Sequence, residues 1–147
     1  MEDISDLIAS TRLAVLAATY TVVGIPAKSL RAVKWRLSRM HGYASILFQN
    51  ELTLVVPEKQ WKQIAHKFSR CSVEAGYKII VLDVKLEWSV VGYLAAISTA
   101  LAEEDVSLGV LSTFSKDILL VKKSKLRKTL RVLNTLIKRA RDSRKGS

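Results

Sequence analysis

The apolar residues of this 147-residue chain change their spacing several times, and the order of these changes occurs twice. Apolar runs typical of strands cover residues 13–24, 43–48, 52–56, 77–86, 107–114 and 117–121. Helical spacing, with an apolar residue at every third or fourth position, covers residues 29–40, 58–70, 89–101 and 124–142. Each half of the chain therefore predicts the element order β-α-β-β-α.

An offset of 65 residues superposes the predicted core positions of the two halves. Residues 54–56 then fall on residues 119–121, and Trp61 falls on Leu126, so the apolar pattern repeats without identical residues. This order predicts an α+β fold of two ferredoxin-like units, each with an antiparallel sheet and helices on one face. Each unit lacks a clear fourth strand. We expect a strand exchanged between the halves, or a second chain, to complete the sheets.

The predicted organisation is an N-terminal segment (1–12), a first unit (13–76), a second unit (77–141) and a basic tail (142–147). Apolar residues make up 49% of the chain, which is enough for a folded core. The uncharged stretch 13–27 is shorter than the roughly twenty residues that a bilayer span needs. Glu2, Asp3 and Asp6 stand where a signal peptide would be basic. We therefore expect a cytoplasmic protein without a transmembrane segment.

The sequence offers no sign of a metal site, a cofactor or an enzyme. The only cysteine, Cys71, is expected to be a structural or surface thiol, and His41 and His66 have no further ligands at metal-binding spacing. No nucleophile is paired with a base, and no glycine-rich phosphate loop occurs. Catalysis is therefore the least favoured of the functions considered.

Positive charge is concentrated at the C-terminal end. Residues 1–121 hold 13 Lys or Arg and 12 Asp or Glu, whereas residues 122–147 hold 11 Lys or Arg and a single carboxylate, Asp142. Two interpretations stay open: a solvated face that aids solubility, or a surface for nucleic acid, an acidic protein or an anionic membrane. The cations of this basic patch are Lys122, Lys123, Lys125, Arg127, Lys128, Arg131, Lys138, Arg139, Arg141, Arg144 and Lys145.

Two segments of the second half resemble a known family. Residues 87–95, Glu-Trp-Ser-Val-Val-Gly-Tyr-Leu-Ala, and residues 111–121, Leu-Ser-Thr-Phe-Ser-Lys-Asp-Ile-Leu-Leu-Val, are similar to the strand-to-helix loop and the hairpin of paired ACT-domain proteins. That branch includes the cytosolic arginine sensors and small uncharacterised ACT proteins. The resemblance covers residues 77–136 well and residues 13–60 loosely, the latter through Ser45 and residues 51–55.

The resemblance implies a regulatory, allosteric homodimer that binds an amino acid or similar small zwitterion at the seam between ACT units. Ser89 is expected to cap a helix whose N-terminus receives the ligand carboxylate, and Asp117 to accept a cationic side chain or the α-amino group. Each residue also has a purely structural interpretation, as a helix cap, a turn residue or a packing aromatic. The implied ligand-binding residues are Glu87, Trp88, Ser89, Val90, Val91, Gly92, Ser112, Thr113, Phe114 and Asp117.

Overall fold

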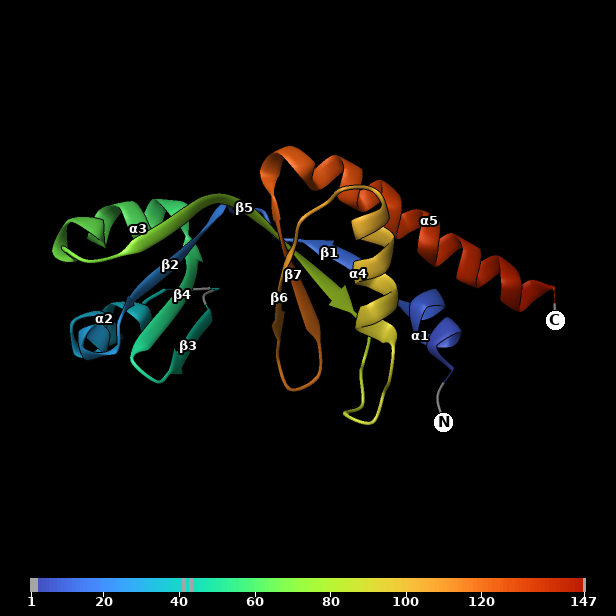
Figure 1. Ribbon diagram of the computed structural model, residues 1–147, viewed down its shortest axis with the longest axis horizontal. Helices are drawn as coiled ribbons and strands as arrows, with labels where there is room; N and C mark the ends of the chain where they lie inside the picture. The colour runs from blue at the N-terminus through green and yellow to red at the C-terminus, as the bar shows by residue number, and fades with distance from the viewer. Residues whose placement is uncertain (1–2, 41, 43, 147) are drawn as a thin grey trace. The chain divides into compact units, whose positions relative to one another are not determined.

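The computed structural model describes residues 3–40, 42 and 44–146, and they form two compact units (Figure 1). The middle unit consists of residues 17–77. The terminal unit consists of residues 3–16 together with residues 78–146. The expected strand start at Tyr43 and the histidine His41 lie outside the described residues.

The middle unit has the order β-α-β-β-α-β. Its elements are β2 (Tyr20–Pro26), α2 (Leu30–Leu37), β3 (Ala44–Phe48), β4 (Glu51–Pro57), α3 (Glu58–Ile64) and the first part of β5 (Ser72–Asp83). The strand order is β3-β4-β2-β5, and neighbouring strands are antiparallel. Alternate strand residues such as Val23 and Leu54 are buried against Val33 of α2 and Trp61 of α3. The helices therefore cover one face of this sheet.

The terminal unit joins the two ends of the chain. It contains α1 (Ile4–Ser10), β1 (Arg12–Val15), the rest of β5, α4 (Tyr93–Glu103), β6 (Gly109–Ser112), β7 (Asp117–Lys122) and α5 (Leu126–Lys145). The strands are ordered β1-β5-β7-β6. Leu82 and Leu119 of the sheet pack with Ile97 of α4 and Leu133 of α5, and all four side chains are fully buried. None of the helices in the described parts of the chain is long and apolar enough to cross a membrane.

The predicted α+β fold is confirmed, and so is the repeat. Residues 54–56 and 119–121, which the 65-residue offset superposes, are all buried in central strands of their units. The missing fourth strands come from two places. Residues of β5 up to Tyr77 pair with β2 in the middle unit, and β1 pairs with residues 80–83 of the same strand in the terminal unit.

Three expected strands have clearly different bounds in the structure, and the one predicted over residues 107–114 is shorter, Gly109–Ser112. The single strand predicted over residues 13–24 is two strands: β1 pairs with residues 80–83 of β5, and β2 pairs with β4 and with the first part of β5. The strand predicted over residues 77–86 runs instead from Ser72 to Asp83. It ends there because the Val84 N–H turns back to donate to the Leu82 carbonyl at 2.9 Å.

Candidate functional site

A pocket of about 210 Å³ lies in the terminal unit between the loop that precedes α4 and the β6–β7 hairpin. Figure 1 shows the loop and the hairpin tip reaching the same end of this unit. Eight of the ten residues implied by the resemblance line it: Glu87, Trp88, Val90, Gly92, Ser112, Thr113, Phe114 and Asp117. Ser89 and Val91 are not among the lining residues, whereas Leu86, Tyr93, Leu94, Ala95, Ser115 and Lys116 are.

Backbone hydrogen bonds hold the two walls of the pocket together. The Leu86 N–H donates to the Ser115 carbonyl at 3.2 Å and ties the loop to the hairpin turn. Within that turn, the Thr113 N–H donates to the Lys116 carbonyl at 2.8 Å. The pocket is therefore built from two linked turns.

The N-terminus of α4 forms one wall. The first intrahelical bond runs from the Ala96 N–H to the Gly92 carbonyl, and no side chain caps this end. The N–H groups of Tyr93, Leu94 and Ala95 therefore have no intrahelical acceptor, and all three residues line the pocket. Free N–H groups at a helix N-terminus, together with the helix dipole, favour an anion.

The expected cap at Ser89 is wrong. Ser89 lies in a turn closed by the Val90 N–H, which donates to the Glu87 carbonyl at 3.0 Å, and the residue before α4 is Gly92. Gly92 has a φ of +92°, a conformation that L-residues with side chains avoid. A Cβ at this position would also lie 2.8 Å from Ile4 Cδ1. The positive φ is what requires glycine here, and the Ile4 side chain would have to move to admit any other residue.

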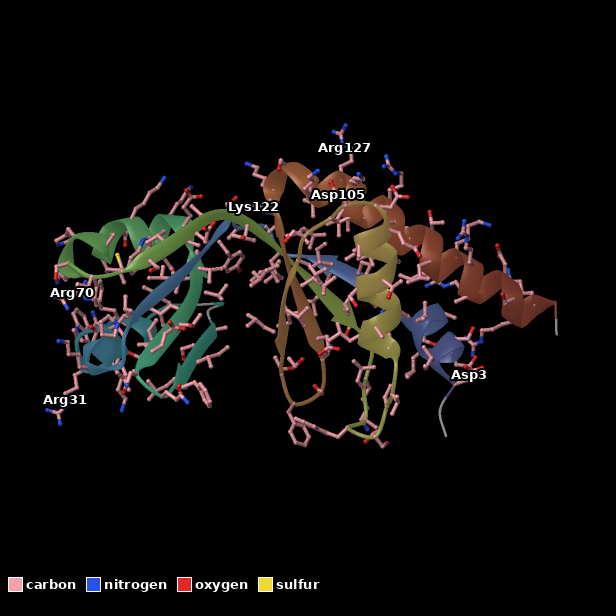
Figure 2. The ribbon with its side chains drawn as sticks, viewed as in Figure 1. Asp3, Arg31, Arg70, Asp105, Lys122 and Arg127 are labelled. Carbon is pink, nitrogen blue, oxygen red and sulfur yellow. The ribbon has the colours of Figure 1, made fainter. Side chains whose placement is uncertain are left out.

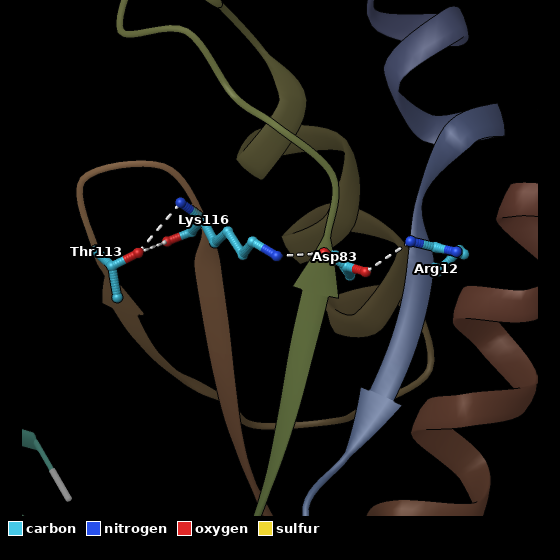
Figure 3. A network of polar contacts seen from close by, with 4 residues as sticks. All are labelled: Arg12, Asp83, Thr113 and Lys116. Carbon is cyan, nitrogen blue, oxygen red and sulfur yellow. Dashed lines mark hydrogen bonds and ion pairs between the residues drawn. The ribbon is translucent and has the colours of Figure 1, made fainter. Parts of the chain in front are cut away.

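Asp117 forms the opposite wall, where β7 begins. It pairs with Ser112 across the hairpin, and the Ser112 hydroxyl donates to Asp117 Oδ1 at 2.5 Å. Among the described residues, Asp117 forms no ion pair. The neighbouring cation, Lys116, is directed elsewhere: its ammonium pairs with Asp83, which also binds Arg12 at 3.2 Å (Figure 3). The Asp117 carboxylate is therefore left without a cationic partner in this part of the chain.

Tyr93 connects the pocket to the N-terminal segment. Its hydroxyl is hydrogen-bonded to Thr11 Oγ1 at 2.8 Å, and the Thr11 hydroxyl donates to the Leu7 carbonyl of α1. Burial raises the pKa of Tyr93, the hydrogen bond with Thr11 lowers it, and the nearby charge of Asp117 raises it. The phenol therefore stays protonated as pH rises through the ordinary tyrosine pKa near 10, the range in which unfolding would let it ionise.

Exposed apolar side chains lie on the two turns that form the pocket. Trp88 and Phe114 are 78% and 83% exposed, and their ring centroids lie 5.9 Å apart at an interplanar angle of 56°. Val91 is 80% exposed. Large apolar side chains this exposed, gathered at two adjacent turns, are typical of a surface that another molecule covers.

The ion pairs of Asp83 lead to a pH prediction. The Lys116 hydrogen bond and charge, followed by the smaller effects of Arg12, hold the pKa of Asp83 below its usual value of 3.8. Replacing Lys116 by Met should raise this pKa, and replacing Arg12 by Met should raise it less. NMR titration of the Asp83 carboxyl carbon measures both. A lowered pKa favours the folded state above the ordinary pKa, and this contribution is lost as pH falls through the folded-state value. An unchanged Asp83 pKa in Lys116→Met would contradict the pairing.

Some cations of the basic patch form ion pairs or hydrogen bonds within the terminal unit. Arg144 Nε lies 2.7 Å from Asp6 Oδ1, the Arg141 Nε–H donates to the Ala9 carbonyl at 2.8 Å, and Lys138 pairs with Asp142. The first two contacts join α5 to α1. Binding of nucleic acid or an acidic protein by α5 stays a prediction, since part of its charge has this structural role.

The other candidate groups are not gathered into a site. Cys71 is an exposed free thiol, and His66 is exposed. In residues 3–40, 42 and 44–146, no three His, Cys, Asp or Glu side chains are placed to hold a metal ion.

Residues 72–135, which include the whole pocket lining, match the family described as the ACT domain. This agrees with the resemblance at family level, while the branch of the arginine sensors stays a prediction. No match was found among curated proteins.

Several solved structures share the fold. Protein Atu0741 from Agrobacterium tumefaciens has a TM-score of 0.71 at 20% identity, covering 86% of this chain and 89% of its own. Aspartate kinase from Clostridium acetobutylicum, described as an allosteric enzyme, has a TM-score of 0.69 at 14% identity, covering 85% of this chain and 34% of its own. The regulatory subunit of aspartate kinase from Thermus flavus has a TM-score of 0.62 at 9% identity, covering 84% and 95%. At these identities the likeness establishes the fold.

Proposed function

We propose that this protein is a small-molecule-binding regulatory module of the ACT type, and that its pocket binds a free amino acid. One observation carries the proposal: the uncapped N-terminus of α4 and the carboxylate of Asp117, which forms no ion pair with any described residue, line the same pocket. The first suits a carboxylate and the second suits an ammonium group. A zwitterion with both groups on one carbon matches this pair.

The size of the pocket supports a small ligand. Its volume of about 210 Å³ is below the roughly 300–1,000 Å³ of sites that hold drug-sized molecules. Trp88 and Phe114 at the mouth add apolar surface for the ligand side chain. The match of residues 72–135 to the ACT domain, and the regulatory description of one structural relative, support the same assignment.

The contacts of the pocket offer a route for regulation. Gly92 approaches Ile4 of α1, and Tyr93 is hydrogen-bonded to Thr11 just after that helix. A ligand that binds the N–H groups of Tyr93 and its neighbours acts directly on the segment that these contacts support. Ligand binding would then shift the population of α1 positions, provided that the ligand binds one position more tightly.

The exposed apolar mouth supports a second copy of the chain as the partner. Trp88, Val91 and Phe114 are more exposed than any other large apolar side chain of the described residues. A homodimer that covers this surface would enclose the ligand and make dimerisation depend on it. Sedimentation analysis with and without ligand tests this part of the proposal, and an unchanged mass would remove it.

Isothermal titration of the purified protein against each of the twenty amino acids tests the proposed function. We expect heat with one or a few of them. For any amino acid that binds, its C-terminal amide and its N-acetyl derivative should each bind at least tenfold more weakly, because each removes one of the two charges. If no amino acid binds to a protein that is folded by circular dichroism, the assignment is wrong.

A further inference from the structure

The middle unit carries a group of cations without carboxylate partners. Residues 27–50 contain no Asp or Glu, and their five cations are Lys28, Arg31, Lys34, Arg36 and Arg39. None of the five forms an ion pair with any described residue. Four of them are exposed, and Figure 2 shows Arg31 pointing away from α2 (Figure 2). These cations are available to an anionic partner.

The positive charge of the middle unit does not show in the net charge of residues 1–121, which hold 13 Lys or Arg and 12 Asp or Glu. Residues 17–77 hold nine Lys or Arg and three Asp or Glu, which gives the middle unit a net charge of +6. Residues 1–16 and 78–121 hold four Lys or Arg and nine Asp or Glu, and they offset most of it. Because the fold places these segments in the other unit, the middle unit is strongly basic by itself.

The Trp35 ring contacts the guanidinium groups of two of these cations. It is 51% exposed, and the guanidinium carbons of Arg36 and Arg39 lie 4.5 Å and 5.2 Å from the centroid of its ring. A guanidinium stacked on an aromatic ring keeps its N–H donors at the edge, where they fit the oxygens of a phosphate. The Arg36 Nε–H is buried and has no acceptor among the described residues, so the exposed Arg31 and Arg39 are the arginines that a phosphate can reach most readily.

We propose that α2 and the short turns before and after it, residues 28–39, bind the phosphodiester backbone of a single-stranded nucleic acid. Cations one helical turn apart can contact successive phosphates, and the exposed Trp35 ring provides a stacking surface for an unpaired base. An anionic membrane fits less well. The apolar side of α2, with Val33 and Leu37, is buried in the core of the unit and cannot insert into lipid.

Fluorescence anisotropy with a labelled 20-nucleotide single strand tests this proposal. We expect the logarithm of the affinity to fall linearly with the logarithm of salt concentration. The double variant Arg31→Gln, Arg39→Gln should bind roughly 10- to 50-fold more weakly at 0.1 M salt and have a salt slope smaller by about 1.4, which corresponds to two lost phosphate contacts. The control is the double variant Arg127→Gln, Arg131→Gln on α5, which removes the same charge from exposed positions. It should keep the affinity and the salt slope of the wild type.

The proposal would be overturned if the folded wild-type protein did not bind, if the salt response were flat, or if binding were lost in the α5 control and kept in the α2 variant. Tighter binding to phosphatidylserine vesicles than to the oligonucleotide would also overturn it. Trp35→Phe supplies a second readout, because nucleic acid should quench tryptophan fluorescence in the wild type and quench it much less in this variant. Equal quenching in both proteins would show that Trp35 is not part of the nucleic-acid-binding surface.

Discussion

Replacing Trp61 by Ala should destabilise the middle unit by about 3–5 kcal/mol, the cost typical of removing a buried Trp side chain. Trp61 is 5% exposed and packs from α3 against the sheet. Its ring stacks on Phe68 at a centroid distance of 5.7 Å and an angle of 21°. Alanine would leave a cavity that the two helices and four strands of the unit cannot close without moving.

Native-state hydrogen exchange measures this effect for the middle unit separately. The amides of its central strands, such as those of Val23 and Leu54, should exchange roughly 100- to 5,000-fold faster in Trp61→Ala, the factor that corresponds to this loss of stability. The matched control is Trp35→Ala, the same substitution in the same unit at a half-exposed position. It removes only the stacking with Arg36 and Arg39 and should cost about 0.5–1 kcal/mol. Equal effects of the two substitutions would contradict the assignment of Trp61 to the core.

The core could be predicted from the sequence because burial follows the period of the apolar residues. Leu54 and Leu119 stand 65 residues apart, and both are fully buried in central strands. The ends of β5 could not be predicted in the same way. Its first residues, Ser72 to Ala75, alternate polar and apolar side chains, but all four are exposed, and the segment is held in the sheet by the pairing of Ser72, Val73 and Glu74 with β2. An alternation of only four residues that buries no side chain is too short to fix where a strand begins.

The candidate site was predictable in part. The family-like segments identified the two turns that the fold brings together, and eight of the ten residues line the pocket. Ser89 is predicted as the helix cap because Ser is common at that position. The residue that precedes the helix is instead Gly92, three residues later, which has a positive φ. The pairing of Lys116 with Asp83 was not predictable, because the two residues are 33 positions apart and meet only through the sheet. That pairing is what leaves Asp117 available.

Replacing Asp117 by Asn should weaken the binding of an amino acid by about 1.5–3 kcal/mol, roughly 10- to 150-fold in Kd, the range typical of a hydrogen bond to a charged group at a half-buried position. The substitution keeps the size of the side chain and an oxygen that accepts from the Ser112 hydroxyl, so the hairpin should stay intact. It removes only the negative charge that we assign to the ligand ammonium. Isothermal titration with the amino acid that binds the wild type most tightly measures the change.

The N-acetyl derivative of that amino acid separates a lost charge contact from a general loss of the pocket. It carries no ammonium charge, so its affinity should be the same for the wild type and Asp117→Asn, whereas a distorted pocket would lower both affinities. Asp105→Asn is the matched control, because Asp105 is exposed in the same unit and has a φ of +57° that Asn also tolerates. Wild-type affinity in Asp117→Asn would show that the ligand ammonium binds elsewhere. The α4 N-terminus would then be the one remaining recognition element, and the pocket would be selective for carboxylates in general.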